Sequence, residues 1–223
     1  MIQSVVRLAL VTIACATIGL AGMHSAAPAD RPIKIVALGD SLTAGLGLPA
    51  ADAFPAKIQR ALIAKGSVVE VSDAGVSGDT AAGGLARLGW SVPQGTDAVI
   101  LELGANDMLR GIDPKQTRST MDQIVRQLTD RGIAVLVCGM RAAPNLGEDY
   151  ARAFNVIFPD VVAAYADRKV TLYPFFLDGV AADPKLNQPD GLHPTAQGID
   201  IIVSRILPKV EDLVARANAN KGR

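Results

Sequence analysis

The chain has 223 residues, of which 49% are hydrophobic, and its 22 basic side chains are balanced by 22 acidic ones. This length and composition suffice for one sizeable core and are too short for two comfortable domains. With no net charge, no basic stripe and one tryptophan, the chain lacks the usual features of nucleic-acid-binding proteins, so we expect no nucleic-acid partner.

The first 29 residues are predicted to be a secretory signal peptide, which leaves residues 30–223 as one domain. Arg7 precedes an apolar run from Leu8 to Gly22, and small residues follow it. This run of about 15 residues is shorter than the roughly 20 that a membrane-spanning helix needs. We therefore expect a cleaved, periplasmic or secreted protein with no stable membrane span. Lipidation at Cys15 is the less favoured alternative, because the preceding residues match a bacterial lipobox poorly.

Cleavage of this segment would leave one histidine and one cysteine in the chain. His24 and Cys15 would be removed, so that His193 and Cys138 remain. Any imidazole chemistry must then use His193, and a zinc site with two or three histidines is excluded by their number. Cys138 closes an apolar run, has no partner for a disulfide and is expected to be buried. We predict no metal and no other cofactor.

The rest of the chain alternates short apolar runs with longer amphipathic segments. Five runs are apolar almost throughout, which is typical of parallel strands that are covered on both faces. These predicted strands are Ile33–Leu38, Val68–Val71, Ala98–Leu103, Ile133–Val137 and Val170–Tyr173.

Between the strands, apolar side chains recur at the helical period. One predicted helix carries Phe54, Ile58 and Leu62, and another begins at Asp113-Pro114 and ends at Gly132. Two further helices precede and follow the last strand, and the prolines Pro159 and Pro208 predict a kink in the first and a break in the second. Right-handed crossovers place helices on both faces of a parallel sheet, so we predict a flavodoxin-like α/β fold, a three-layer α/β/α sandwich around a five-stranded parallel sheet.

Four polar segments follow predicted strands at their carboxyl ends, where ligands bind in sheets of this kind. Their members come after the first, second, third and fifth strands in chain order. The segments are Gly39-Asp40-Ser41-Leu42, Gly75-Val76-Ser77-Gly78-Asp79, Gly104-Ala105-Asn106-Asp107 and Asp190-Gly191-Leu192-His193.

Ser41, His193 and Asp190 are the residue types that nucleophilic catalysis requires. A serine hydroxyl is a poor nucleophile until an imidazole takes its proton, and the imidazole needs a carboxylate on its other nitrogen. Asp190 is close enough in sequence to reach Nδ1 of His193. Taken alone, Ser41 could be a turn or cap residue and Asp190 part of an Asx turn, so the prediction depends on the joint pattern.

Acyl transfer also requires hydrogen-bond donors for the oxyanion that forms in the transition state. Gly78 offers a backbone N–H without side-chain obstruction, and Asn106 offers a side-chain amide on a neighbouring loop. With the N–H of Ser41, these make three candidate donors. Gly78 and Asn106 could instead be turn residues, and we expect Asp40 and Asp107 to be hydrogen-bonding scaffold.

The four segments resemble the four signatures of the SGNH (GDSL) hydrolase family, in the same order and at similar spacing, and the resemblance extends over residues 33–214. It implies a serine hydrolase that cleaves carboxylic esters or thioesters through an acyl-enzyme. Residues 103–111 and 140–147 are similar to the bacterial branch of acyl-CoA thioesterase I, lysophospholipase and arylesterase, except that Leu146 stands where that branch often has a tyrosine. The resemblance assigns catalysis to Ser41, Asp190 and His193, and oxyanion binding to Ser41, Gly78 and Asn106.

Apolar side chains near these segments favour a small-molecule acyl ester or thioester as the substrate. The candidate substrate-binding residues are Leu42, Leu109, Ile112 and Leu146, with Met108 beside them. Each could instead anchor its loop in the core. A carbohydrate or peptidoglycan O-acetylesterase could use the same catalytic residues, but aromatic residues make up 4% of the chain, and no platform for stacking sugars is evident.

A nucleotide-binding, flavodoxin-like module is the alternative outside the hydrolases. The segment Gly45-Leu46-Gly47-Leu48-Pro49-Ala50 matches a loose dinucleotide fingerprint, and Asp73 follows it at a suitable distance. In a true fingerprint the first glycine lies in the turn directly after the strand. Gly45 lies well beyond Leu38, and Pro49 interrupts the pattern, so this alternative is disfavoured.

Overall fold

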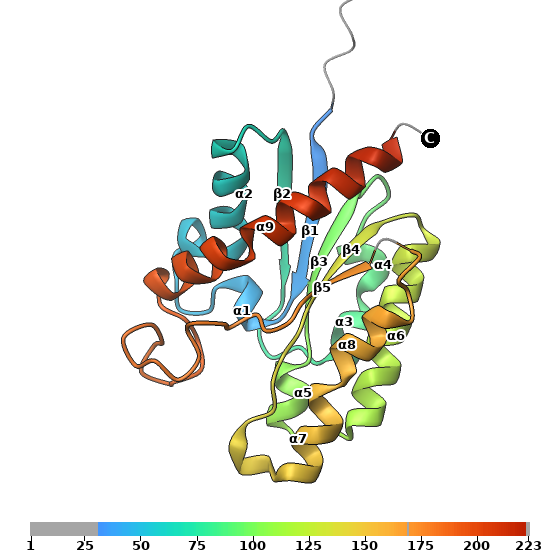
Figure 1. Cartoon of the computed structure of the whole chain (residues 1–223). Helices are drawn as coiled ribbons and strands as arrows, with labels where there is room; N and C mark the ends of the chain where they lie inside the picture. Colours follow the sequence, from blue (N-terminus) through green and yellow to red (C-terminus); the bar gives the residue numbers. More distant parts are fainter. Residues whose placement is uncertain (1–30, 169, 222–223) are drawn as a thin grey trace, which may run out of the picture. The chain divides into compact units, whose positions relative to one another are not determined.

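The computed structural model describes residues 31–168 and 170–221. The predicted signal peptide, with Cys15 and His24, lies outside these residues. Within them, five parallel strands form one sheet in the order β2-β1-β3-β4-β5 (Figure 1). The strands are β1 (Ile33–Gly39), β2 (Val69–Gly75), β3 (Ala98–Glu102), β4 (Ala134–Cys138) and β5 (Val170–Tyr173). The predicted strands and the flavodoxin-like order are confirmed.

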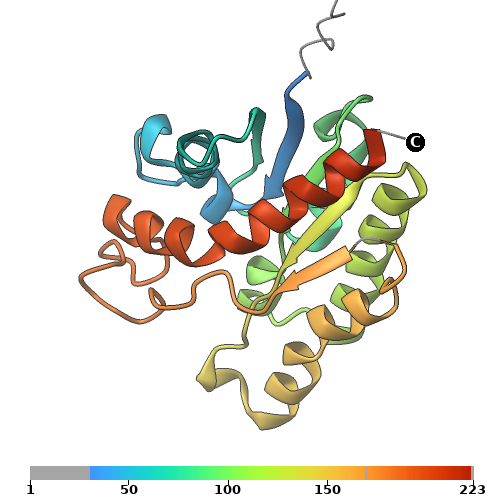
Figure 2. The same cartoon turned by 45° about the horizontal axis from the view of Figure 1, so that its top comes forward.

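Helices cover both faces of this sheet, which confirms the predicted three layers. On one face lie α2 (Phe54–Ala64) and α9 (Ala196–Lys221), and α9 crosses the strands in both views (Figures 1 and 2). On the other face lie α3 (Ala81–Ala86), α6 (Pro114–Asp130) and α8 (Ile157–Ala163). The shorter elements are α1 (Ser41–Ala44), η1 (Ala50–Asp52), α4 (Leu88–Ser91), α5 (Ala105–Leu109), η2 (Pro144–Leu146) and α7 (Glu148–Asn155).

The strand β2 runs four residues further than the sequence predicted. Its last part is polar, and Ser72 and Asp73 pair with Val36 and Ala37 of β1. As an edge strand β2 has a neighbour on one side only, so polar side chains can remain exposed there without breaking the pairing. By contrast, β3 and β4 are buried along their whole length.

The helix α6 illustrates how the sequence determines an element and the face that it buries. Asp113 caps it by accepting a hydrogen bond from the N–H of Lys115, and Pro114 occupies its first position. Gly132, with φ of 74°, follows its end. Its apolar side chains at helical spacing are all buried: Met121, Ile124, Val125 and Leu128.

The two prolines act differently from the predictions. The segment around Pro159 is two helices, because α7 ends before Val156 and α8 begins after it. Pro159 therefore lies in the first turn of α8, where its missing N–H leaves no bond unmade. The predicted break at Pro208 is wrong, since α9 continues through it. Pro208 is exposed, on the face of α9 away from the core, while Ile206 and Val210 remain buried on either side.

Among the described residues, none of the helices combines the length and hydropathy required to cross a bilayer.

Candidate active site

The turn at the end of β1, residues 39–42, places Ser41 at the first position of α1. Asp40 caps this helix by accepting a 2.9 Å hydrogen bond from the N–H of Leu42. The helix lasts one turn, because Gly45 follows in the left-handed conformation with φ of 71°. Ser41 is 8% exposed, and it lines a cavity at the carboxyl edge of the sheet. The Ser41 turn (residues 39–42) therefore presents a nearly buried hydroxyl to a bounded space.

His193 bridges Ser41 and Asp190. Its Nε2 lies 2.8 Å from Oγ of Ser41, and its Nδ1 lies 2.7 Å from Oδ2 of Asp190. Hydrogen bonds from the backbone N–H groups of His193 and then Leu192, followed by the imidazole contact, lower the pKa of Asp190 to about 2. An ionised carboxylate only accepts, so Nδ1 carries the hydrogen and Nε2 of the neutral ring faces the hydroxyl as an acceptor. In this arrangement an imidazole can take the proton of a serine hydroxyl.

Asp190 and His193 lie on one loop, residues 187–194. Hydrogen bonds close the base of this loop and join it to the segment that follows the Ser41 turn. Asn187 and Pro194 form a bridge across its base, and the N–H of Gln188 donates a 2.7 Å hydrogen bond to the carbonyl of His193. The side chain of Gln188 also donates to the carbonyl of Leu46, at 2.7 Å. The sequence offered no signal for this role of Gln188, because the contact joins residues 142 positions apart.

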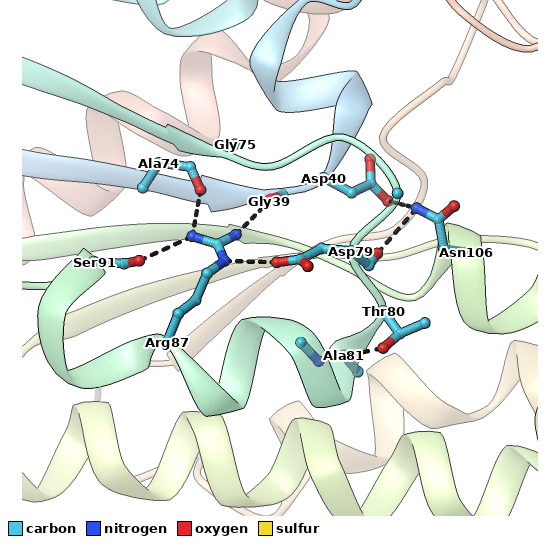
Figure 3. A network of polar contacts seen from close by, with 12 residues as sticks. Gly39, Asp40, Ala74, Gly75, Asp79, Thr80, Ala81, Arg87, Ser91 and Asn106 are labelled. Carbon is cyan, nitrogen blue, oxygen red and sulfur yellow. Dashed lines mark hydrogen bonds and ion pairs between the residues drawn. The ribbon is translucent and has the colours of Figure 1, made fainter.

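Gly78 and Asn106 reach the same cavity from two other loops. Gly78 has φ of 85°, in the region that glycine adopts most readily. Asn106 lies in the first turn of α5, and its Nδ2 donates to Oδ2 of Asp40 at 3.0 Å and to the carbonyl of Asp79 at 2.9 Å (Figure 3). Both amide hydrogens are thus directed at acceptors within the protein. Donation to a bound oxyanion requires one of these bonds to be shared or exchanged.

The cavity that these residues share has a volume of about 520 Å³ and a largely apolar lining. Of the predicted substrate-binding residues, Leu42 and Leu109 line it, and so does Met108. Ile112 and Leu146 are not among its lining residues. Ile112 follows the end of α5, where its carbonyl accepts a hydrogen bond from the hydroxyl of Tyr150. Leu146 lies in η2, directly before α7, and is half-buried there.

The family model of GDSL-like lipases and acylhydrolases matches residues 37–201, a range that includes all four polar segments. The chain belongs to the GDSL-like lipase/acylhydrolase family. The arylesterase of Vibrio mimicus is 40% identical to it over 162 residues, which are 72% of this chain and 80% of that relative. The thioesterase 1/protease 1/lysophospholipase L1 of Escherichia coli K12 is 36% identical over 190 residues, 85% of this chain and 87% of that protein.

Solved structures agree with this membership. The crystal structure of AlinE4, an SGNH-hydrolase family esterase, is 41% identical and has a TM-score of 0.69. The match covers 82% of this chain and 97% of AlinE4. The chain is therefore an ester or thioester hydrolase of the SGNH type, as the sequence predicted.

The dinucleotide alternative has no support in this GDSL-like hydrolase. Gly45 does not lie in the turn between β1 and the first helix, because α1 intervenes and Gly45 ends it. Gly47 packs against the side chain of Gln188, where an added Cβ would come within 2.3 Å of its Oε1. Leu46, which lies between these two glycines, lines the hydrolase cavity.

Two buried carboxyl groups lie close together at the Ser41 turn of this GDSL-like hydrolase: Asp40 within the turn and Glu102 at the end of β3. Burial raises the pKa of Asp40 to about 6, although hydrogen bonds from Leu42 and Asn106 act in the opposite direction. Burial and then the charge of Asp40 raise the pKa of Glu102 well above its usual value. Asp107, predicted as scaffold, accepts hydrogen bonds from the N–H of Ala81 and the hydroxyl of Thr117, and so ties α5 to α3 and α6.

Sequence reasoning missed part of the lining of the GDSL-like hydrolase cavity. These residues follow β4 and β5 at the same edge of the sheet, and they are Met140, Arg141, Ala142, Ala143, Pro144, Phe175, Leu177, Ala181 and Ala182. Arg141 lies over the ring of Phe175, 4.9 Å from its centroid. Two signals were available: the rule that ligands bind beyond strand ends and, for residues 140–147, the resemblance to the thioesterase branch. Of residues 140–147, only Leu146 was predicted to bind substrate.

Proposed function

We propose that this hydrolase cleaves its ester or thioester through an acyl-enzyme on Ser41, with His193 as general base and Asp190 as the carboxylate that orients the imidazole. The observation that carries the proposal is the unbroken series of contacts from Asp190 through His193 to Oγ of Ser41, at 2.7 and 2.8 Å. These lengths are those of good hydrogen bonds. The hydroxyl at the end of the series faces the cavity.

In the first step, Oγ of Ser41 bonds to the substrate carbonyl carbon while its proton moves to Nε2 of His193. The tetrahedral intermediate then collapses, and the alkoxide or thiolate leaves with that proton. A water molecule next gives its proton to His193 and attacks the acyl-enzyme. Collapse of the second intermediate releases the carboxylic acid and returns a proton to Ser41. Asp190 stays ionised throughout and stabilises the imidazolium.

The developing oxyanion is bound by the backbone N–H groups of Ser41 and Gly78 and by the amide of Asn106. The bond from Asn106 to the carbonyl of Asp79 is the one that gives way to the oxyanion. A negatively charged acceptor forms a stronger hydrogen bond than a neutral carbonyl, which favours this exchange. The bond from Asn106 to Asp40 meanwhile keeps the amide in place.

The acyl group of the substrate occupies the apolar part of the cavity, against Leu42, Met108 and Leu109. Burial of apolar surface stabilises a bound acyl chain by about 0.8 kcal/mol for each methylene group. The apolar lining thus favours acyl esters and thioesters over acetylated sugars.

The test of the catalytic assignment combines a variant with a covalent probe. Ser41→Ala should abolish turnover while the thermal melt stays native-like, and a fluorophosphonate should label Ser41 alone. A panel of p-nitrophenyl esters from acetate to palmitate, beside acyl-CoA thioesters, then compares chain lengths and leaving groups. Label recovered on a peptide without Ser41, or turnover retained by Ser41→Ala, contradicts the assignment.

The domain boundaries are part of the same proposal. Residues 1–29 act as a signal peptide, and residues 30–223 form an enzyme that works in the periplasm or outside the cell. The support is the charged, apolar and small-residue pattern at the N-terminus. Intact-mass measurement of the exported protein tests it: a chain that begins near Ala29 fits cleavage, whereas a lipid-modified chain that begins at Cys15 contradicts it.

A further inference from the structure

Arg87 carries a nearly buried guanidinium group, with 7% of its side chain exposed, in a position where the sequence predicted no function. It follows α3 and points toward the carboxyl ends of β1 and β2 (Figure 3). Its Nε donates to the carboxylate of Asp79 at 2.6 Å, and its Nη1 to the carbonyl of Ala74 and the hydroxyl of Ser91. Its Nη2 donates to the carbonyl of Gly39 at 2.8 Å.

These contacts reach the loops that hold the three proposed oxyanion donors. The carbonyl of Gly39 belongs to the Ser41 turn. Asp79 directly follows Gly78, so the ion pair restrains the backbone beside that donor. In the free enzyme the carbonyl of Asp79 accepts the hydrogen bond from Asn106, so it sets the position of that amide before the oxyanion forms. A single guanidinium group therefore contacts the residue two positions before Ser41 and the residue directly after Gly78. Asn106 bonds to the backbone of that same residue, Asp79.

The shape of the arginine side chain suits contact with several acceptors at once. A guanidinium presents five N–H donors in a rigid plane and remains charged, whereas a lysine ammonium is a point charge on a flexible stem. Carbonyl oxygens at converging strand ends need donors when they are withdrawn from water. Arg87 supplies one for Ala74, adds a second donor to the carbonyl of Gly39, which also accepts from the N–H of Val76, and balances the charge of Asp79.

We propose that Arg87 is a positioning residue of this hydrolase: through Asp79 and the carbonyl of Gly39, it holds the oxyanion donors in the geometry that the transition state requires. Arg87 does not line the cavity and touches no reacting atom. The proposal rests on the oxyanion donors assigned under the proposed function. It predicts that loss of Arg87 slows the chemical step and leaves substrate binding nearly unchanged.

The first experiment compares kcat and KM of Arg87→Met and Arg87→Lys with those of the unaltered enzyme, per active site titrated with a fluorophosphonate. Displacement of catalytic groups by about 1 Å can cost roughly 100-fold in rate, so we expect kcat to fall about 10- to 100-fold. KM should change by less than about threefold, because the acyl cavity is left intact. A kcat per titrated site within about twofold of the unaltered enzyme overturns the proposal.

Arg131→Met is the matched control. Arg131 also donates to backbone carbonyls, those of Val92 and Pro93, but these partners do not belong to the loops that carry the proposed oxyanion donors. Its replacement should leave kcat and KM unchanged. An equal loss of kcat in Arg131→Met would mean that removal of any such arginine disturbs the enzyme, and would overturn a specific role for Arg87.

A double-mutant cycle separates positioning from general stabilisation. If Arg87 acts through the oxyanion donors, Arg87→Met should cost several-fold less in an Asn106→Ala background than in the unaltered enzyme. Independent effects that simply multiply overturn the proposal. If Arg87→Met does not fold, Asp79→Asn removes the ion pair and keeps the carbonyl that Asn106 uses. It should then show the same loss in kcat, and an unchanged kcat overturns the proposal.

The outcome is also separable from that of the proposed catalytic residues. An inactive Ser41→Ala beside a fully active Arg87→Met overturns the role of Arg87 alone. An active Ser41→Ala overturns the catalytic assignment itself, whatever Arg87→Met does.

Discussion

The hydroxyl of Thr43 donates a hydrogen bond of 2.8 Å to Oε2 of Glu102, a carboxyl group that is fully buried beneath the Ser41 turn. The backbone N–H of Asp40 lies 3.4 Å from the same oxygen. Oε1 of Glu102 has no hydrogen-bond partner among the described residues. Burial with so few donors disfavours the charged form of this acid and raises its pKa, and this links the stability of the fold to pH.

Glu102→Gln should therefore reduce the dependence of stability on pH. The folded-state pKa values of Glu102 and Asp40 lie above their ordinary values of 4.5 and 3.8. Their protonation stabilises the fold fully below those ordinary values, and this contribution is lost as pH rises through about 6 for Asp40 and through the raised pKa of Glu102. Denaturant unfolding at pH 5 and pH 8 should show a smaller decrease for Glu102→Gln, by roughly 1 kcal/mol or more.

The control for this measurement is Glu70→Gln, because Glu70 is exposed on β2. It should leave the difference between the two pH values unchanged. An equal pH dependence in the unaltered enzyme and Glu102→Gln would contradict a raised pKa for the buried Glu102.

Asp190→Asn should lower kcat by about 1,000- to 10,000-fold, as loss of the carboxylate does in other catalytic triads. An amide can still accept the backbone hydrogen bonds from Leu192 and His193, so the loop should remain folded. It does not hold the proton on Nδ1 or stabilise an imidazolium. Asp183→Asn is a suitable control, since Asp183 makes a similar turn contact with the N–H of Lys185. A kcat within tenfold of the unaltered enzyme would argue against Asp190 as the partner of His193.

Asn106→Ala should lower kcat by about 100- to 1,000-fold and leave KM nearly unchanged, because the donor acts mainly in the transition state. Asn106→Asp should be at least as harmful. Its carboxylate would lie beside both the oxyanion and Asp40, which accepts from Asn106 at 3.0 Å. Thermal melts must accompany the kinetics, since Asn106 also bonds to the carbonyl of Asp79. A native-like melt with nearly full kcat would make Asn106 a turn residue.

Leu109→Ala should weaken the preference for longer acyl chains. Leu109 lines the cavity and is half exposed, so it can cover an acyl chain that reaches past Ser41. We expect kcat/KM for octanoyl and decanoyl esters to fall about 5- to 10-fold, which corresponds to roughly 1 kcal/mol of lost apolar contact, while acetate changes little. Leu146→Ala is the control, because Leu146 does not line the cavity. An equal loss for acetate would indicate a damaged site.

The fold and the four polar segments could be predicted because their signals are local. Apolar runs such as Ala98–Leu103 identify buried strands, and the regular spacing along Pro114–Asp130 identifies a helix and its buried face. Where packing outweighed local preference, the predictions failed. Pro208 did not end α9, because buried residues on both sides hold that helix against the sheet.

By itself, the sequence determined the parallel sheet, the family of the protein and the residue types at the carboxyl edge of the sheet. It could do so because strand and helix periods and short motifs are properties of neighbouring residues. Only the tertiary structure decided how those residues meet. His193 lies against Ser41 from 152 positions away, and Arg87 reaches β1 across 48 positions. Such contacts depend on how separate elements pack and on where each side chain points, which no local pattern specifies. For the same reason Leu109 faces the cavity while Ile112, three residues later, does not.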